Sequence, residues 1–176
     1  MSLRIAFLVQ GEGRGHMTQA LALRQILERR GHRVSRVILS RTGRRPTPEF
    51  FLRKIHAPVA TVESPEFVAD RDDRAVRKLS TLTHNLAQAP RLVGSIRELD
   101  EILGEVQPDV VVNFFDLLGG LHNRLYRPDW PMVCVGHQYL FRHPDFGFPG
   151  GHRFDRWALK IYTKLTASGA ARTLAL

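Results

Sequence analysis

The chain has 176 residues, of which 43% are hydrophobic and 24% are charged, and its formal net charge is +9. This length and composition suit one globular domain with a sizeable core and exclude an intrinsically disordered chain. No stretch approaches the ~18 consecutive apolar residues of a membrane span, and the first residues lack the pattern of a signal peptide. We therefore expect a cytoplasmic protein.

The positive charge concentrates in one segment, where seven basic residues stand against the single acid Glu49. The basic residues are Arg33, Arg36, Arg41, Arg44, Arg45, Arg53 and Lys54. Nucleic acid, a membrane surface and a phosphorylated substrate are the partners that such a segment attracts, and a solvated face without a partner is the equal alternative. No aromatic-interleaved RNA-binding motif or zinc-finger spacing accompanies the cluster, so nucleic acid is the least favoured partner.

The N-terminal part predicts a strand, a loop, a helix and a second strand. Residues 4–10 are a compact apolar run, typical of a buried parallel strand, and a glycine loop follows them. Residues 17–30 predict a helix that Gly31 ends. Its apolar stripe is Ala20, Leu23, Ile26 and Leu27, with Arg24 on the opposite side and Met17 and Leu21 off the stripe. Residues 33–41 predict the second strand.

The rest of the chain continues the alternation. Residues 42–58 begin as a loop, and helices are expected near 74–88 and 91–105. The remaining predicted elements are strands at 59–62, 109–115 and within 131–141, a short helix at 121–127, a loop at 142–153 and a helix at 156–167. The apolar end, residues 168–176, is either a frayed helix end or the place where a longer protein continues.

Alternating helices and buried strands predict an α/β fold with a doubly wound, Rossmann-like parallel sheet. No internal boundary divides residues 1–176. Ligands bind such sheets at the C-terminal ends of the strands, near a switch point in strand order. The loops 11–16 and 116–120 both follow predicted strands, so we expect the ligand site there.

The loop GEGRGH, residues 11–16, offers backbone N–H groups and a positive helix end to an anion. Gly11, Gly13 and Gly15 let the chain turn and let a ligand approach the backbone. The loop is neither a dinucleotide fingerprint nor a P-loop, because both need a glycine where this chain has His16. An imidazole in an anion-binding loop remains.

His16 is a candidate general base. A positive helix end lowers the pKa of an adjacent imidazole and favours its neutral form, and a carboxylate would orient the ring. Asp116, just after the predicted strand 109–115, is the candidate carboxylate, because the ends of parallel strands meet at one edge of a sheet. Helix capping or packing is the alternative role for both residues.

Other candidate residues give weaker signals. Cys134 lies in an apolar run without a charged neighbour, which predicts a buried thiol and not a nucleophile. His137, His143 and His152 match no zinc spacing, so no metal site is expected. The stretch 136–146 mixes polar and aromatic residues and suits either a pocket lining or a surface loop.

Three stretches carry a family resemblance: IAFLVQGEGRGHMTQALAL (5–23), PDVVVNFFD (108–116) and GHQYLFRHP (136–144). Together they resemble the N-terminal domain of GT-B glycosyltransferases, in the branch of the UDP-glucuronosyltransferases and the peptidoglycan N-acetylglucosaminyltransferase. The resemblance implies that residues 1–176 are the acceptor-binding half of such an enzyme, with a C-terminal nucleotide-sugar domain expected beyond them. The chain alone would have little or no transferase activity. The reaction would use no metal or other cofactor, with a nucleotide sugar, a UDP-sugar in this branch, as co-substrate.

The resemblance also implies roles for single residues. His16 would deprotonate a hydroxyl of the sugar acceptor, and the acidic partner of the family falls near Asn113, with Asp116 slightly beyond. Contacts with the acceptor or its phosphate are expected from Gly11, Gly13, Arg14, Gly15, Asn113 and His137. In the peptidoglycan relatives the acceptor is lipid-linked, so residues 48–55, PEFFLRKI, are a candidate for peripheral contact with the inner face of the membrane. The alternative function is a non-catalytic Rossmann-like module that binds a phosphorylated ligand or nucleic acid through its basic surface.

Overall fold

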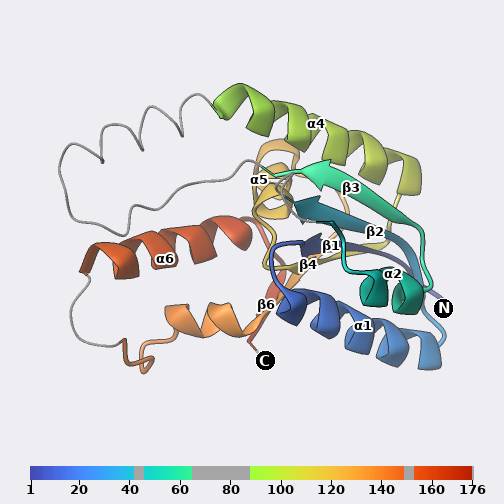
Figure 1. The fold of residues 1–176 in the computed structure, drawn as a ribbon, viewed down its shortest axis with the longest axis horizontal. Helices are drawn as coiled ribbons and strands as arrows, with labels where there is room; N and C mark the ends of the chain where they lie inside the picture. The colour runs from blue at the N-terminus through green and yellow to red at the C-terminus, as the bar shows by residue number, and fades with distance from the viewer. Residues whose placement is uncertain (42–45, 65–87, 149–152, 176) are drawn as a thin grey trace.

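The computed structural model describes residues 1–41, 46–64, 88–148 and 153–175. Within them, six strands form one sheet in the order β3-β2-β1-β4-β5-β6, and every neighbouring pair is parallel. The strands are β1 (Arg4–Gln10), β2 (Arg33–Arg41), β3 (Val59–Glu63), β4 (Val110–Phe114), β5 (Met132–Val135) and β6 (Arg172–Leu174). The predicted α/β, doubly wound, Rossmann-like sheet is confirmed (Figure 1).

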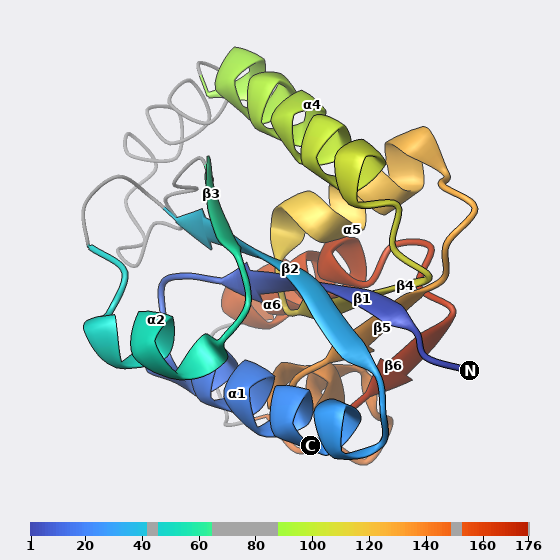
Figure 2. The same cartoon turned by 90° about the vertical axis from the view of Figure 1, so that its right-hand side faces the viewer.

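Helices cover both faces of the sheet (Figure 2). One face carries α1 (Arg14–Arg29) and α2 (Glu49–Ile55), and the other carries α4 (Ala89–Val106) and α5 (Leu117–Tyr126). Alternate residues of β1 therefore enter different cores, because successive side chains of a strand point to opposite faces. Phe7 packs with α1 and α2, whereas Leu8 packs with α4 and α5.

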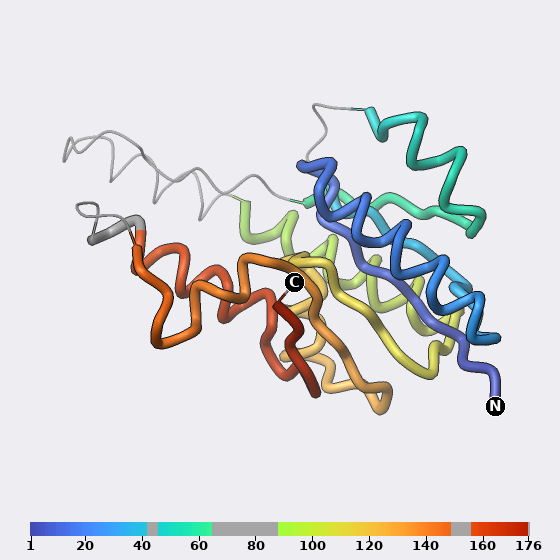
Figure 3. Tube along the Cα trace, turned by 90° about the horizontal axis from the view of Figure 1, so that it is seen from below, coloured from blue at the N-terminus to red at the C-terminus, as the bar shows by residue number. Residues whose placement is uncertain are grey.

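Two further helical segments follow β5, namely η1 (His137–Arg142), a 3-10 helix, and α6 (Arg153–Thr166). α6 packs against both α5 and η1. Figures 1 and 3 show η1 and α6 side by side, reaching past the edge of the sheet at which the strands end. These segments thus stand next to the loops in which the sequence predicts the site.

The switch point of the sheet lies between β1 and β4. From β1 the chain adds β2 and then β3 on one side, and it returns through α4 to place β4, β5 and β6 on the other. The residues that follow the carboxyl ends of β1 and β4 are 11–13 and 115–116. Ligands of doubly wound sheets bind at this point.

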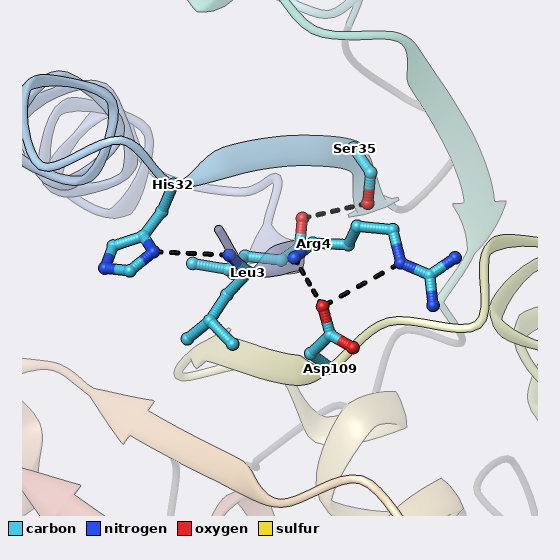
Figure 4. A network of polar contacts seen from close by, with 6 residues as sticks. Leu3, Arg4, His32, Ser35 and Asp109 are labelled. Carbon is cyan, nitrogen blue, oxygen red and sulfur yellow. Dashed lines mark hydrogen bonds and ion pairs between the residues drawn. The ribbon is translucent and has the colours of Figure 1, made fainter. Parts of the chain in front are cut away.

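Polar contacts fix the opposite end of β1 (Figure 4). The Leu3 N–H donates to Nδ1 of His32, and the Arg4 N–H donates to Oδ2 of Asp109 at 2.6 Å. The Asp109 carboxylate also pairs with Nε of Arg4 at 3.8 Å, and the Ser35 hydroxyl donates to a carbonyl of β1. These contacts join the starts of β2 and β4 to β1, so they set the register that brings the three carboxyl ends together.

The buried face of α1 differs from the prediction. Met17 and Arg24 are buried, whereas Ile26 is 43% exposed. The side of α1 that faces the sheet is formed by positions 17, 20 and 24, each about one helical turn from the next. Arg24 tolerates burial because its stem packs inside while its guanidinium reaches Glu28 at the rim, at 2.9 Å.

Three elements were not predicted, and one of them is η1, in a stretch that was expected to line a pocket or to form a surface loop. α2 lies in the segment expected to begin as a loop, and β6 lies in the residues for which a frayed helix end was one interpretation. β6 has only three residues, all exposed, so it has no apolar pattern by which to recognise it. The helix predicted at 74–88 lies outside the described residues.

Gly120 permits the close contact between α5 and α6. A Cβ on this residue would lie 2.7 Å from the carbonyl carbon and oxygen of Thr166 and would also meet the carbonyl oxygen of Leu165. These atoms belong to the main chain, which cannot rotate away as a side chain can. The position therefore requires glycine.

We expect Gly120→Ala to lower the free energy of unfolding by about 1–3 kcal/mol, the usual cost of overpacking. The matched control is Gly104→Ala in α4, where a Cβ would meet nothing within 4 Å. That variant should gain about 0.5–1 kcal/mol from helix propensity. Urea denaturation measures both changes, and equal stabilities of the two variants would contradict the packing argument.

Candidate active site

The candidate site lies at the switch point of the sheet. The glycine loop follows β1, Phe115 and Asp116 follow β4, and Gly136 follows β5 and leads into η1. His16 lies in the first turn of α1. The fold thus brings residues 11–16 and 116–120 to the same edge of the sheet. The second stretch was predicted to be a loop, but α5 already begins in it at Leu117.

The three glycines of the loop have different roles. The N–H of Gly11 donates to the carbonyl of Ser40 at 2.7 Å, and a Cβ on Gly11 would lie 2.7 Å from that oxygen. Gly13, the N-cap of α1, is extended, and Gly15 is helical. A Cβ on either would meet nothing within 4 Å. Gly11 therefore holds the loop against β2, whereas Gly13 and Gly15 leave open space in front of the backbone.

His16 is held by three elements that are distant in the sequence. Its ring stacks with that of Phe115, with centroids 5.8 Å apart, and lies parallel to that of His137 at 6.3 Å. Its Nε2 lies 3.0 Å from Nε2 of Gln138. The residue is only 5% exposed. α1, the turn after β4, and η1 together enclose one imidazole.

The environment keeps this imidazole neutral. Burial lowers the pKa of His16 below its ordinary value, and the neighbouring His137 lowers it further. The carboxamide of Gln19, one turn along α1, acts in the opposite direction. From the sequence, the positive end of α1 is expected to lower this pKa, whereas in the structure burial is the main cause. An uncharged ring has a lone pair that can accept a proton at neutral pH.

Asn113 and Phe115 shape the turn after β4. Asn113 is fully buried: its Oδ1 accepts the Asp116 N–H at 2.7 Å, and its Nδ2 donates to the carbonyls of Asp116 and Thr166, both at 3.0 Å. This bracket holds Phe115 at φ 58°, in the left-handed region that non-glycine residues rarely adopt. In place of the predicted contact with an acceptor, Asn113 therefore supports the turn from within the core.

Asp116 caps α5. Its Oδ1 accepts the Gly119 N–H at 2.9 Å, and the residue is 2% exposed. Burial raises the pKa of Asp116, while the Ser40 hydroxyl and the N–H groups of Gly119 and Leu118 favour the ionised form. In the part of the chain that the structure describes, no hydrogen bond joins Asp116 to His16. The structure therefore shows the capping role and does not form the predicted dyad.

The remaining candidates fall into exposed and buried groups. Arg14 and His137 are exposed, and the Arg14 guanidinium lies 6.0 Å from the ring centroid of Phe50. Cys134 is buried, as predicted, and burial raises the pKa of its thiol to about 11, which makes it a poor nucleophile. Across residues 1–41, 46–64, 88–148 and 153–175, no three His, Cys, Asp or Glu side chains are grouped to hold a metal ion. His152 lies outside these ranges.

The segment predicted to contact a membrane forms α2, and its apolar residues divide. Phe51 and Ile55 are buried in the core, whereas Leu52 is 48% exposed beside Arg53 and Lys54. The exposed apolar surface is therefore smaller than the sequence suggests. Among the described helices, none has the length and apolarity needed to cross a bilayer.

Phe115 and Gln138 are the site residues that the sequence analysis did not single out. Gln138 lies within the polar and aromatic stretch 136–146, whose pocket-lining interpretation was the only signal for it. Phe115 carries no such signal. Its ring stacks on His16 because its backbone is left-handed, and an apolar strand pattern does not reveal that conformation.

Over residues 3–174, the chain matches the family model described as glycosyl transferase family 1. The chain belongs to glycosyltransferase family 1. No curated protein matches it.

Solved structures of glycosyltransferases share its fold. The spinosyn rhamnosyltransferase SpnG is 17% identical, with 97% of this chain and 44% of that chain covered and a TM-score of 0.53. The glycosyltransferase SsfS6 of Streptomyces sp. SF2575 is 14% identical, with 94% and 44% covered and a TM-score of 0.52. MurG of Acinetobacter baumannii is 18% identical, with 89% and 39% covered and a TM-score of 0.50. The chain thus has the Rossmann-like fold found in GT-B enzymes and spans less than half the length of these three.

The contrast between Gly11 and Gly15 can be measured. We expect Gly11→Ala to lower the free energy of unfolding by about 1–3 kcal/mol, because the added methyl group meets the Ser40 carbonyl. Gly15→Ala meets open space in a helix and should be neutral or stabilising by up to about 1 kcal/mol. Thermal unfolding monitored by circular dichroism compares the two, and destabilisation by Gly15→Ala would show that the space is occupied by the protein itself.

The burial of Asp116 predicts a pH dependence. Asp116→Asn keeps a good N-cap and removes the titrating group. Because the folded pKa is raised, the native state holds the proton more tightly than the unfolded chain, and ionisation opposes folding. The stability of the wild type relative to the variant should therefore fall as the pH rises from the ordinary value of 3.8 through the raised folded value. Urea denaturation at a series of pH values measures the difference, and a constant difference would refute the effect of burial.

Proposed function

We propose that this chain binds the acceptor in a glycosyltransferase that uses a nucleotide sugar, and that His16 is the general base. One observation supports the proposal most: a buried, uncharged imidazole lies in the first turn of α1, beside an open glycine loop at the switch point of the sheet. Membership of glycosyltransferase family 1 supports the class of reaction. The loop supplies space for a ligand, and the imidazole supplies a proton acceptor next to that space.

The positive end of α1 favours an acceptor that carries an anionic group. The Gly13 N-cap makes no side-chain hydrogen bond to the first turn, and that turn contains no acidic residue. The N–H groups at a helix start attract phosphates, and the exposed Arg14 adds a positive charge there. A lipid-linked acceptor with a phosphate group suits this arrangement.

In the proposed reaction, the acceptor hydroxyl lies against the ring of His16. A ring nitrogen takes the hydroxyl proton while the hydroxyl oxygen forms a bond to the anomeric carbon of the donor sugar. The bond from that carbon to the diphosphate oxygen breaks, and the nucleoside diphosphate leaves with the electron pair. His16 then releases its proton to solvent. A UDP-sugar is the donor that we propose.

We further propose that a second domain binds most of the nucleotide sugar. The chain covers 44%, 44% and 39% of the three solved glycosyltransferases that share its fold, so most of each of those proteins has no counterpart here. An acceptor site on one domain and a donor site on another would meet at the edge of the sheet where His16 lies. The present chain alone would then bind an acceptor without transferring sugar.

His16→Asn in the full-length protein should lower kcat by about 10²–10⁴, the usual contribution of a general base. The matched control is His56→Asn, an exposed residue in the left-handed region, which asparagine adopts readily. The assay is UDP release from a panel of UDP-sugars with hydroxyl acceptors. In the wild type, activity should also fall as the pH drops through the lowered pKa of His16, because the imidazolium cannot accept a proton.

Full activity of His16→Asn would contradict the role of the base. A wild-type protein that binds a UDP-sugar or nucleic acid without transfer would instead support the non-catalytic module. In that case, a salt titration of nucleic-acid binding identifies the ligand, since phosphate contacts weaken steeply with salt.

A further inference from the structure

Two carboxamides flank the ring of His16. Nε2 of Gln138 lies 3.0 Å from Nε2 of His16, and Gln19 approaches the ring from the next turn of α1. Nδ1 of His16 and Oε1 of Gln19 are both buried, and neither has a well-formed hydrogen bond to another described group. The carboxamide of Gln138 thus lies at Nε2 of the ring, and that of Gln19 lies near Nδ1.

The contact between the two nitrogen atoms has one chemical interpretation. An amide nitrogen can only donate a hydrogen bond, so Nε2 of His16 must accept it through its lone pair. In the neutral ring the proton is then on Nδ1, where the Gln19 oxygen is the nearby acceptor. An imidazolium has no lone pair and cannot accept the N–H of Gln138. The contact therefore exists only with the neutral ring.

We propose that Gln138 is the positioning residue of His16 and that its carboxamide N–H keeps Nε2 unprotonated. This inference rests on the proposed function, in which His16 is the base. A hydroxyl donates a hydrogen bond in the same way as an amide N–H, so an arriving acceptor takes over the lone pair from Gln138. The base is thereby held in the tautomer that it needs before the acceptor binds.

The surrounding backbone positions the segment that carries Gln138, whose Oε1 is buried without a hydrogen-bond partner among the described residues. Gly136 begins the turn, and a Cβ there would lie 3.1 Å from Oε1 of Gln138, so the glycine leaves room for the carboxamide. The Tyr139 N–H donates to the Gly136 carbonyl at 3.2 Å, and the buried Tyr139 ring packs on Phe115 with centroids 5.4 Å apart. Phe115 in turn stacks on His16. His16 and Tyr139, the residue after Gln138, thus pack on the same aromatic ring.

A carboxylate in this position would have the opposite effect. It would accept a proton from Nε2 and stabilise the imidazolium, whereas the amide donor stabilises the neutral ring. The charged and titratable groups in residues 11–16, in the turn after β4 and on η1 are Glu12, Arg14, Asp116, His137, Tyr139 and Arg142, and α1 carries Arg24, Glu28 and Arg29 further along. Of these, His137 acts on the pKa of His16, and it lowers that pKa.

The test is ¹⁵N NMR of the histidine ring nitrogens in the 176-residue chain, which requires no transferase activity. In the wild type we expect a protonated Nδ1 and an unprotonated Nε2 on His16. Gln138→Met, which has a similar shape but no donor, should lose this preference and move the titration midpoint of His16 to higher pH. Gln138→Glu should place a proton on Nε2 and move the midpoint further upward. The exposed His56 is the internal reference for the pH scale.

The control is Gln25→Glu, which adds the same charge on the exposed side of α1 and should leave the His16 signals unchanged. A wild type with the proton on Nε2, or a Gln138→Met variant with the wild-type tautomer and midpoint, would overturn the proposal. If Gln138→Glu does not fold, Gln138→Met decides the question alone. The base role has its own test in sugar transfer, so an active His16→Asn enzyme refutes that role while the NMR result still decides what holds the ring.

Discussion

The side chain of Asn113 holds together most of what surrounds the site. It bonds both the N–H and the carbonyl of Asp116 and also the last carbonyl of α6. It therefore ties the end of a central strand to the start of one helix and the end of another. A buried amide without hydrogen bonds costs folding free energy, so these three bonds stabilise the fold. The left-handed turn at Phe115, and with it the ring that stacks on His16, depends on them.

A neutral histidine follows from this construction, because burial and a second imidazole both lower its pKa. The turn after β4 supplies an aromatic ring, η1 supplies an amide and a second imidazole, and the start of α1 carries His16. Desolvation disfavours the charged ring, and the nearby His137 disfavours it as well. Asp116, the acid that the sequence offers, is engaged in capping α5. The site therefore separates the titrating group from the carboxylate that a catalytic dyad would place beside it.

The sheet was predictable because each of the stretches 4–10, 33–41 and 109–115 contains a run of consecutive apolar residues that are buried on both faces of the sheet. β6 was not, because its residues are exposed and only its pairing with β5 defines it. The face of α1 was assigned from charge, and Arg24 violates that rule by reaching Glu28 from a buried position.

The glycine loop and His16 form a local motif that the sequence displays directly. Their partner Gln138 is 122 positions away, and no periodicity shows which side chain of η1 meets the ring. The family resemblance includes the stretch 136–144, which contains Gln138, but the residue expected from it was His137. Asp116 was chosen because a strand end brings it to the correct edge of the sheet, yet two side chains at one edge can still point to different neighbours.

The last strand has a mechanical connection to the site. The Gly136 N–H donates to the carbonyl of Leu174 at 3.0 Å. Gln138 follows Gly136 by two residues and contacts His16. Two hydrogen bonds and the two peptide bonds between Gly136 and Gln138 thus connect this short edge strand to the imidazole. The position of β6 therefore constrains where the chain enters η1, and with it the placement of Gln138. The edge strand is thus linked, through Gly136 and Gln138, to the surroundings of His16.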